Sequence, residues 1–359
     1  MIRRSVLLLA VLPSFALASI SDVVVPPGFI VEEYADVPKA RSLALGDKGT
    51  LFVSNRKGRS VYAVVENADG STRTIELLRG MSTPNGIAFH DGDLFVAEID
   101  RVLRYANIEA NLDAVPEAEV LDVDLPSDRH HGWRYIGFGP DDKLYISIGA
   151  PCNVCDKAGY AQIVRMNADG SGRETFASGI RNSVGFTWHP TTDELWFTDN
   201  GRDMMGDNKP PCELNHAPRA GLHFGFPYCH GGDILDPQFG NGRECENFMP
   251  PVQNLGPHVA PLGVKFYTGD MFPSEYRNQV FIAEHGSWNR SKKIGYRVTL
   301  VRLDGNRAVS YEPFAYGWLQ GQSVSGRPVD LLVKGDGSLL VSDDLAGKIY
   351  RISYIGESD

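Results

Sequence analysis

A five-residue apolar segment recurs six times along the chain and constrains its fold more than any other feature. The copies lie at 51–55 (LFVSN), 94–98 (LFVAE), 144–148 (LYISI), 195–199 (LWFTD), 280–284 (VFIAE) and 339–343 (LLVSD). A second short apolar segment precedes each copy, at 42–45, 86–90, 135–139, 185–189, 263–267 and 329–333. Turns rich in Gly, Asp and Pro join the members of most pairs, and a third strand-like segment follows most copies. Each unit is therefore expected to be an antiparallel meander.

Such a meander cannot bury both of its faces alone, and a closed ring of six solves this problem. The repeat predicts an all-β, six-bladed β-propeller built of four-stranded antiparallel blades, forming a single domain over residues 19–359. Closure of the ring predicts that an early strand completes or abuts the blade containing 348–353. The stretch from Gly201 to Pro261 is expected to be a long loop region, and 285–297 a shorter one. In a propeller, such loops converge on the mouth of the axial channel, where we expect the site.

The first residues, MIRRSVLLLAVLPSFALAS, combine a basic start, an apolar centre and an Ala-x-Ala site. This pattern predicts a secretory signal peptide over residues 1–18, cleaved after Ala18, and a periplasmic or secreted protein. A buried N-terminal strand is the alternative. No other apolar run is long enough to span a bilayer, so no transmembrane segment is expected in the mature protein. The net charge of −10 argues against nucleic acid as a partner.

Five cysteines in an exported chain indicate disulfides. Cys152 and Cys155 are close enough to pair with each other. Cys212, Cys229 and Cys245 leave one odd thiol, which the sequence does not identify, and a zinc site from these three is a weaker alternative. No His follows Cys155, so the attachment pattern of c-type haem is absent.

Several motifs stand beside the repeat: HHGWRYIGFGPDDKLYISIGAPCNVC, GIRNSVGF, TDNGRDMMGDNKPPCELN, AEHGSWNR and GRPVDLLV. Together they resemble the soluble quinoprotein sugar dehydrogenases, which use pyrroloquinoline quinone, and most closely their sorbosone dehydrogenase-like branch. The resemblance covers nearly the whole mature chain. It implies a catalytic base eight residues before the Gly of Gly-Pro-Asp, which is His131 here, with His130 in a supporting role. A neutral imidazole with an ordinary pKa of ~6.5 would lose activity on acidification.

The resemblance also implies residues around the quinone. Arg181 would be catalytic and cofactor-binding, because a guanidinium binds oxyanions and can polarise a quinone carbonyl. Asn182, Arg327, Asp344 and His285 would contact the cofactor, with Arg290 an alternative to His285. The main-chain carbonyls of Gly201 and Arg202 would hold Ca²⁺. Tyr228 and Trp288 could stack on a flat ring. Two departures from the family are Val184, where a Gln is usual, and Arg134, one place nearer the His than in the sugar enzymes.

The leading interpretation is a dehydrogenase that oxidises an aldose or related, sorbosone-like sugar by hydride transfer to pyrroloquinoline quinone. Calcium would polarise the quinone, and a separate acceptor, a cytochrome or the quinone pool, would take the electrons. A gluconolactonase-type metal-dependent hydrolase is an alternative, with acidic and Asn ligands at blade strand ends: Glu98, Asn182, Asp199, Glu284 and Asp343. A non-catalytic binding propeller is the other alternative.

Overall fold

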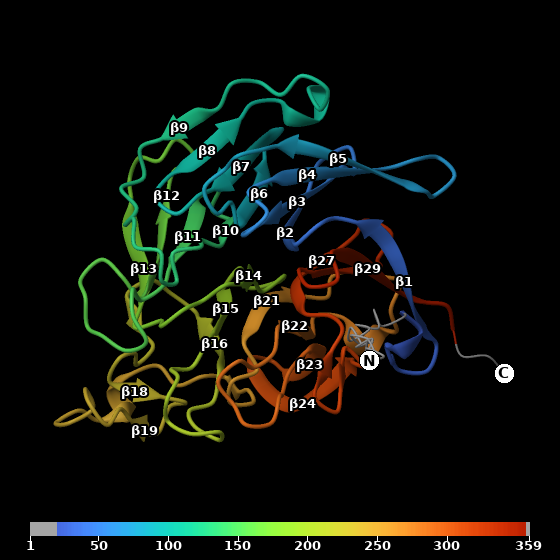
Figure 1. Cartoon of the computed structure of the whole chain (residues 1–359). Coiled ribbons are helices and arrows are strands. Elements are labelled where there is room, and N and C mark those ends of the chain that lie inside the picture. Colours follow the sequence, from blue (N-terminus) through green and yellow to red (C-terminus); the bar gives the residue numbers. More distant parts are fainter. Residues whose placement is uncertain (1–19, 357–359) are drawn as a thin grey trace, which may run out of the picture.

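The computed structural model describes residues 20–356, which form a ring of six antiparallel sheets (Figure 1). The expected signal segment, residues 1–18, lies outside the described residues. Six strands lie innermost around the axis of the ring, one from each sheet: β2, β6, β10, β14, β21 and β27. The predicted six-bladed β-propeller is confirmed.

The blades are four-stranded, and in blades 1 to 5 the four strands follow the order of the chain. Blade 1 contains β2 (Ala40–Leu45), β3 (Leu51–Asn55), β4 (Val61–Glu66) and β5 (Thr72–Leu78). Blade 2 contains β6 (Gly86–His90), β7 (Asp93–Ala97), β8 (Val102–Tyr105) and β9 (Glu119–Leu121). Blade 3 contains β10 (Ile136–Phe138), β11 (Leu144–Ile148), β12 (Gln162–Met166) and β13 (Glu174–Ser178), with β17 (Leu222–His223) added in parallel to β13.

The second half of the ring repeats this plan. Blade 4 contains β14 (Phe186–Trp188), β15 (Leu195–Asp199), β16 (Glu213–Ala217) and β20 (Gln253–Asn254). Blade 5 contains β21 (Pro261–Phe266), β22 (Val280–Glu284), β23 (Arg297–Asp304) and β24 (Arg307–Ala315). Blade 6 contains β27 (Pro328–Val333), β28 (Leu339–Asp343), β29 (Lys348–Tyr354) and, from the other end of the chain, β1 (Phe29–Asp36).

The recurring five-residue segment is the second strand of every blade. All five of its residues are buried in each of the six copies, which explains why it reads as an apolar run without alternation. The strand is covered on both faces because each blade packs against a neighbour on either side. Six apolar clusters fill the six interfaces between blades, as Phe52 and Leu94 do between blades 1 and 2. Each large apolar side chain buried there contributes about 1.5–3 kcal/mol.

The ring closes through β1, the first strand, which pairs antiparallel with β29, the last, from Phe29 opposite Tyr354 to Asp36 opposite Lys348. The expectation that an early strand completes the last blade is therefore confirmed. Without β1 the outer edge of β29 would present unpaired N–H and C=O groups to solvent.

The region 201–261 is not the long loop that the sequence predicts, because it contains β16 and β20 of blade 4. The sequence of β16, ELNHA, hides a buried strand because its polar residues are buried with partners: Glu213 accepts from the Gly231 N–H and from the Asn215 amide. The same region carries a small sheet of β18 (Cys229–His230) and β19 (Ile234–Leu235), and the 3₁₀ helix η3 (Cys245–Asn247).

The remaining elements are short and lie between or beyond the blades: η1 (Ile20–Asp22), η2 (Ile108–Ala110), η4 (Ser274–Tyr276), β25 (Leu319–Gln320) and β26 (Ser323–Val324). Residues 20–356 include no helix of the length and apolarity needed to cross a membrane.

Candidate active site

A cavity of about 310 Å³ lies at one end of the axial channel. Its wall is rich in arginine, histidine and tryptophan, from five of the six blades and the loops between them: Arg41, Arg56, His131, Trp133, Arg181, Asn182, Val184, Asn200, Gly201, Asp203, Cys212, His258, Ala260, Leu262, His285, Gly286, Trp288 and Arg327. Its volume is within the range of small-molecule sites.

The blade plan explains why these residues meet. Each innermost strand begins at this mouth, and the second strand, being antiparallel, ends there. The residue that directly follows the second strand is Arg56 in blade 1, Asn200 in blade 4 and His285 in blade 5, and all three line the cavity. Residues just before innermost strands, such as Asn182 and Arg327, line it as well. The register of the apolar repeat therefore predicts which residues lie at this mouth of the channel.

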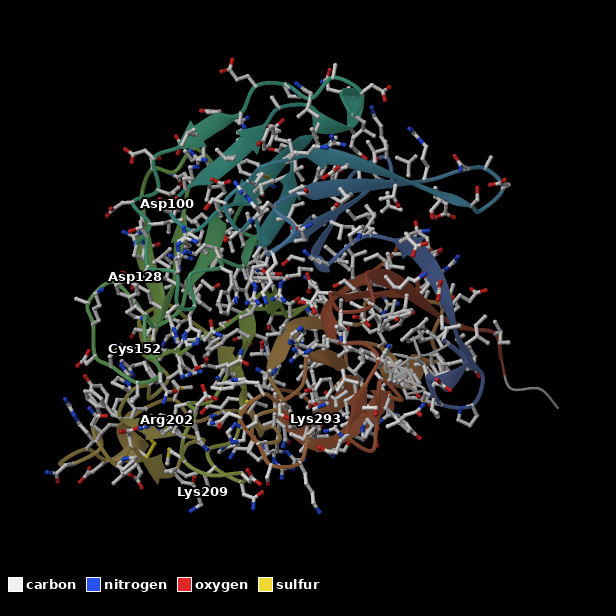
Figure 2. All side chains as sticks on the ribbon, viewed as in Figure 1. Asp100, Asp128, Cys152, Arg202, Lys209 and Lys293 are labelled. Atoms are coloured by element: carbon white, nitrogen blue, oxygen red, sulfur yellow. A yellow bond between two sulfur atoms is a disulfide. The ribbon has the colours of Figure 1, made fainter. Side chains whose placement is uncertain are left out.

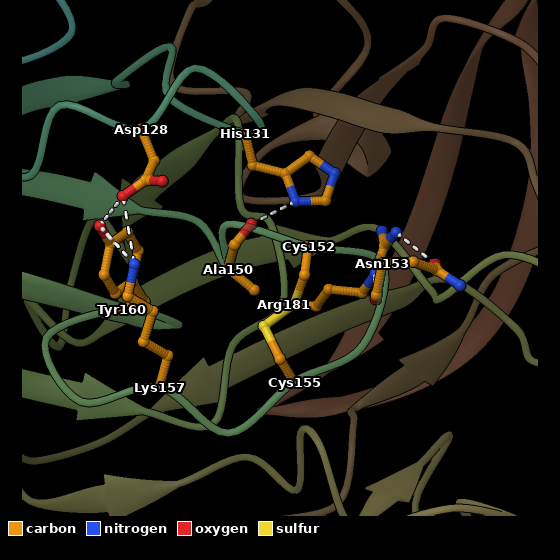
Figure 3. The surroundings of a disulfide bond; sticks show 9 residues. All are labelled: Asp128, His131, Ala150, Cys152, Asn153, Cys155, Lys157, Tyr160 and Arg181. Carbon is orange, nitrogen blue, oxygen red and sulfur yellow. Dashed lines mark hydrogen bonds and ion pairs between the residues drawn. A yellow bond between two sulfur atoms is a disulfide. The ribbon is translucent and has the colours of Figure 1, made fainter.

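His131 lies in the loop before β10 and its ring is buried against the cavity wall. Its Nδ1 is 2.8 Å from the carbonyl oxygen of Ala150 (Figure 3). Since a carbonyl only accepts, Nδ1 carries the hydrogen and Nε2 keeps its lone pair. Burial, with Arg181 and His130 adding to it, lowers the pKa of His131 to about 2. The expected ordinary pKa of ~6.5 is therefore wrong: the imidazole is a neutral acceptor far below neutral pH.

The backbone around His131 is tightly constrained. His131 has a φ of 48°, in the left-handed region, which is common at functional positions. Gly149, the residue after β11, packs against it so closely that a Cβ there would stand 2.7 Å from the His131 Cβ and 2.9 Å from the Asn182 Oδ1. Glycine at 149 thus allows His131 and Asn182 to share one wall. His130, by contrast, is exposed, with its ring centroid 4.1 Å from that of His131.

Arg181 is buried and most of its donors are already engaged by the protein. Its Nε donates to the Asn153 carbonyl (2.8 Å), Nη1 to the Asn200 carbonyl (3.1 Å), and Nη2 to the Asn153 Oδ1 (3.0 Å) and the Asp203 carboxylate (3.2 Å). Burial lowers its pKa, yet a guanidinium stays charged at any physiological pH. Arg181 therefore presents a fixed positive charge to the cavity more than a free pair of donors.

Asp199, at the end of β15, holds the backbone of Arg181 and Asn182. Its two carboxylate oxygens accept from the Arg181 N–H (2.8 Å) and the Asn182 N–H (2.7 Å). Burial, with Glu213 nearby, raises the pKa of Asp199 to about 7. The carboxyl thus supports the cavity wall from behind without lining it.

His285 and Arg327 line the cavity from blades 5 and 6, and Asp344 contacts His285. Arg327 donates to the main-chain carbonyls of His285 and Gly286, both at 2.9 Å. Asp344 accepts from His285 Nε2 (2.8 Å) and from Arg41 Nη1 (2.7 Å), which holds its pKa well below the usual range despite burial. Asp344 is not among the residues that line the cavity, and its carboxylate orients His285 and Arg41.

Arg56 is the main site residue that the motifs do not mark. Its guanidinium lies 4.4 Å from the centre of the Trp133 ring, and no hydrogen-bond partner within residues 20–356 engages it. Burial, with Arg41 and Arg327 nearby, lowers its pKa to about 10. Trp133 in turn lies edge-on to His131, with ring centroids 5.9 Å apart. The register of the repeat could have found Arg56, because it follows LFVSN as His285 follows VFIAE.

The main-chain carbonyls of Gly201 and Arg202, which are expected to hold calcium, belong to the loop that follows β15 (Figure 2). Gly201 lines the cavity, and the Arg202 side chain is buried in an ion pair with Asp236. Among the described residues, Asp203 is the acidic residue that lines the cavity, and its carboxylate is paired with Arg181. Residues 20–356 contain no cluster of three or more His, Cys, Asp and Glu side chains able to hold a metal ion. A cation bound here would be coordinated by the Asp203 carboxylate, by main-chain carbonyl oxygens and by oxygen atoms of the small molecule bound in the cavity.

The five cysteines form two disulfides and leave one free thiol. Cys152 pairs with Cys155 and Cys229 with Cys245, which excludes the three-cysteine zinc site and leaves Cys212 as the buried free thiol of the cavity wall. Trp288 lines the rim and is 70% exposed, while Tyr228 and Arg290 do not line the cavity: the Tyr228 hydroxyl donates to Asp156 and the Arg290 Nε to the Asp207 carbonyl.

The ligand set expected for a lactonase does not form. Glu98 is bonded to Arg101 and the Ser82 N–H, Glu284 to Arg297, and Asp343 to the N–H groups of Arg327, Leu345 and Ala346. Of the five residues, only Asn182 lines the cavity. The remaining polar groups favour binding of an anion, because arginine dominates the wall.

Comparison with known proteins finds similarity over most of the chain. A family model described as glucose/sorbosone dehydrogenase matches residues 97–351. An uncharacterized protein of Borreliella burgdorferi is 36% identical over 348 residues, covering 92% of this chain and 90% of that protein. A pyrroloquinoline quinone-dependent pyranose dehydrogenase of Coprinopsis cinerea is 30% identical over 348 residues, and the match covers 85% of this chain but 42% of that enzyme. The solved holo form of the quinone domain of the Coprinopsis cinerea pyranose dehydrogenase superposes with a TM-score of 0.80 at 22% identity, covering 92% of this chain and 97% of that one.

Proposed function

The chain belongs to the glucose/sorbosone dehydrogenase family, and on that premise we propose that it oxidises an aldose or related, sorbosone-like sugar with pyrroloquinoline quinone as its cofactor. The observation that carries the proposal is the unbalanced positive charge of the cavity. Arg41 and Arg181 are paired with Asp344 and Asp203, but Arg327 is bonded only to carbonyls and Arg56 has no protein partner in the described chain.

This donor set fits a flat quinone that bears several carboxylates. Arg56 is half-buried against Trp133 and has no acceptor among the described residues, so it is available to one carboxylate, because a partly desolvated charge is stabilised by a partner. Arg327, just before β27, supplies a second positive charge to the cavity. Arg181, Asn182 and His285 complete the proposed cofactor contacts, with Asp344 acting through His285.

We assign His131 as the base. Its Nε2 is free to accept the proton of the sugar hydroxyl, and the Ala150 carbonyl keeps the ring in that tautomer. When bound, pyrroloquinoline quinone supplies the two-electron acceptor for the hydride that leaves the sugar carbon. The fixed charge of Arg181 stabilises negative charge that develops beside it, at no reorganisation cost, since its own contacts are already made.

Calcium is part of the proposal. The Asp203 carboxylate and the main chain at Gly201 and Arg202 are hard oxygen donors of the kind that Ca²⁺ prefers. We further propose export to the periplasm or beyond, supported by the signal-like residues 1–18 and by two disulfides. The electrons would then pass to a separate cytochrome or to the quinone pool.

Reconstitution tests the proposed function. The purified apoprotein is titrated with pyrroloquinoline quinone, with and without Ca²⁺, and dye-linked oxidation of aldoses is measured. We expect saturable quinone binding and sugar-dependent dye reduction that chelation abolishes. Absence of quinone binding under all these conditions would refute the assignment.

A further inference from the structure

A short loop closed by a disulfide joins the main groups of the site. The loop spans residues 150–155 and follows β11, and Cys152 pairs with Cys155 across it (Figure 3). At its start, the Ala150 carbonyl accepts from His131 and the Ala150 N–H donates to the Arg181 carbonyl at 2.8 Å. The loop thus contacts both residues assigned to catalysis.

Asn153, inside the disulfide ring, makes most of the remaining contacts. Its carbonyl and its Oδ1 accept from the Arg181 guanidinium at 2.8 and 3.0 Å. The same Oδ1 accepts from the Asp203 N–H (2.9 Å), and Nδ2 donates to the Asp203 carbonyl (3.1 Å). One side chain therefore ties together the arginine and the acidic residue that flank the cavity, although Asn153 does not itself line it.

These contacts determine where the charge of Arg181 lies. An arginine side chain has many rotamers, and its ion pair with Asp203 alone leaves the guanidinium plane free to turn. The Asn153 carbonyl is held by the covalent ring and the Asn153 Oδ1 by the contacts of its amide with Asp203, and together the two acceptors fix the plane of the guanidinium. A site of this kind depends on groups held to within about 0.5 Å of the productive geometry.

We propose that Asn153 is a positioning residue for Arg181, and that the Cys152–Cys155 disulfide makes this position sensitive to redox conditions. Cys152 and Cys155 are half-buried, whereas Cys229 and Cys245 are buried. A dithiol reductant that reaches the loop converts the Cys152–Cys155 disulfide into two thiols and becomes a disulfide itself. The ring then opens, Asn153 is no longer held, and the Arg181 guanidinium is released. The consequence for cofactor binding rests on the proposed function.

The first test follows Arg181 directly in the apoprotein. The Nε–H of Arg181, bonded to the Asn153 carbonyl, should exchange slowly with water in ¹⁵N spectra of the wild-type chain. We expect faster exchange after treatment with dithiothreitol, in Cys152→Ser/Cys155→Ser and in Asn153→Ala. Val154→Ala, in the same ring, and Cys229→Ser/Cys245→Ser are the matched controls and should keep the slow exchange. Arg181→Lys assigns the signal.

The second test measures quinone affinity by titration. Asn153→Ala and the reduced wild-type protein should bind pyrroloquinoline quinone about tenfold more weakly, while Asn153→Asp, which keeps the Oδ1 acceptor, should recover most of the loss. Val154→Ala should bind as the wild type does.

The two tests separate the two proposals. Slow exchange that responds as expected, without quinone binding by the wild type, would retain the positioning role and refute the proposed function. Unchanged exchange in Asn153→Ala and in the reduced wild-type protein would overturn the positioning role, whatever the affinity. If Cys152→Ser/Cys155→Ser fails to fold, dithiothreitol treatment of the wild type decides the redox part.

Discussion

The two ends of the axial channel have cavities of similar size and very different chemistry. The one at the site is about 310 Å³, and its wall carries four arginines, three histidines and two tryptophans. The one at the other end is about 340 Å³ and is lined by the downstream halves of all six innermost strands, with Lys265 as its one charged side chain among the described residues. Burial lowers the pKa of Lys265, and the nearby Asp330 carboxylate offsets part of this effect.

The difference shows that the ring supplies space, whereas the residues at the strand ends supply function. Both cavities follow from closing six sheets around an axis, which the apolar strands alone dictate. The charged groups gather only where second strands end and connecting loops enter. Cavity volume therefore does not distinguish the site from the cavity at the other end of the channel. An arginine without a protein partner among the described residues does distinguish it.

The largest expected effect is loss of both cavities together. Deleting residues 340–359 removes β29 and most of β28, exposing the edges of β1 and β27. We expect the truncated chain to lose its cooperative thermal transition, measured by circular dichroism. A truncated chain that melts cooperatively and still binds quinone would contradict ring closure as the basis of the fold.

The next effect is confined to the site. His131→Ala should lower kcat by ~10²–10⁴-fold, the usual contribution of a general base, and leave quinone affinity and melting temperature near their wild-type values. His130→Ala, beside it but exposed, should cost much less. Steady-state kinetics with the reconstituted enzyme checks both. An essential His130 with a dispensable His131 would move the base by one residue.

Replacing one charged residue at each end of the channel tests the difference between the two cavities. Arg56→Ala should weaken quinone binding by about 1.5–3 kcal/mol, the scale of a charge-assisted hydrogen bond. Lys265→Met removes a positive charge from the other cavity and should leave the affinity unchanged. Titration of the apoproteins by fluorescence quenching measures both. Equal losses in the two variants would mean that the whole channel, not one mouth, attracts the cofactor.

The smallest expected effect is on pH dependence. The folded pKa of His131 is about 2, far below its ordinary value, so the ring stays neutral and its Nε2 lone pair stays unprotonated between pH 8 and 5. Selectively labelled imidazole signals in the apoprotein should show one ring, absent in His131→Gln, that does not shift over this range. A midpoint near 6.5 for that ring would refute the buried, neutral base.

Much of the fold was predictable because a strand buried on both faces requires a short apolar segment, which can be recognised in the sequence. Five of the six second strands have the bounds of their segments, and the sixth, β7, differs by one residue. Blade 4 was predicted least well, because Glu213 and Asn215 are buried through hydrogen bonds that no hydropathy pattern reveals. The site was predictable where a motif is continuous, as at His131 and Arg181, and less so at Arg56, whose neighbours Trp133 and Arg327 are distant in the chain.

The sequence by itself determined the number of blades, the strand pattern and the residues that follow each second strand, because these depend on short apolar segments and their register. Tertiary structure decided which of the mouth residues face the cavity and which stand behind it. In the folded chain, Asp344 bonds to Arg41 and His285, and Cys229 pairs with Cys245. Asn153 contacts Arg181. These outcomes depend on distances between segments far apart in the chain, which are fixed only when the ring closes.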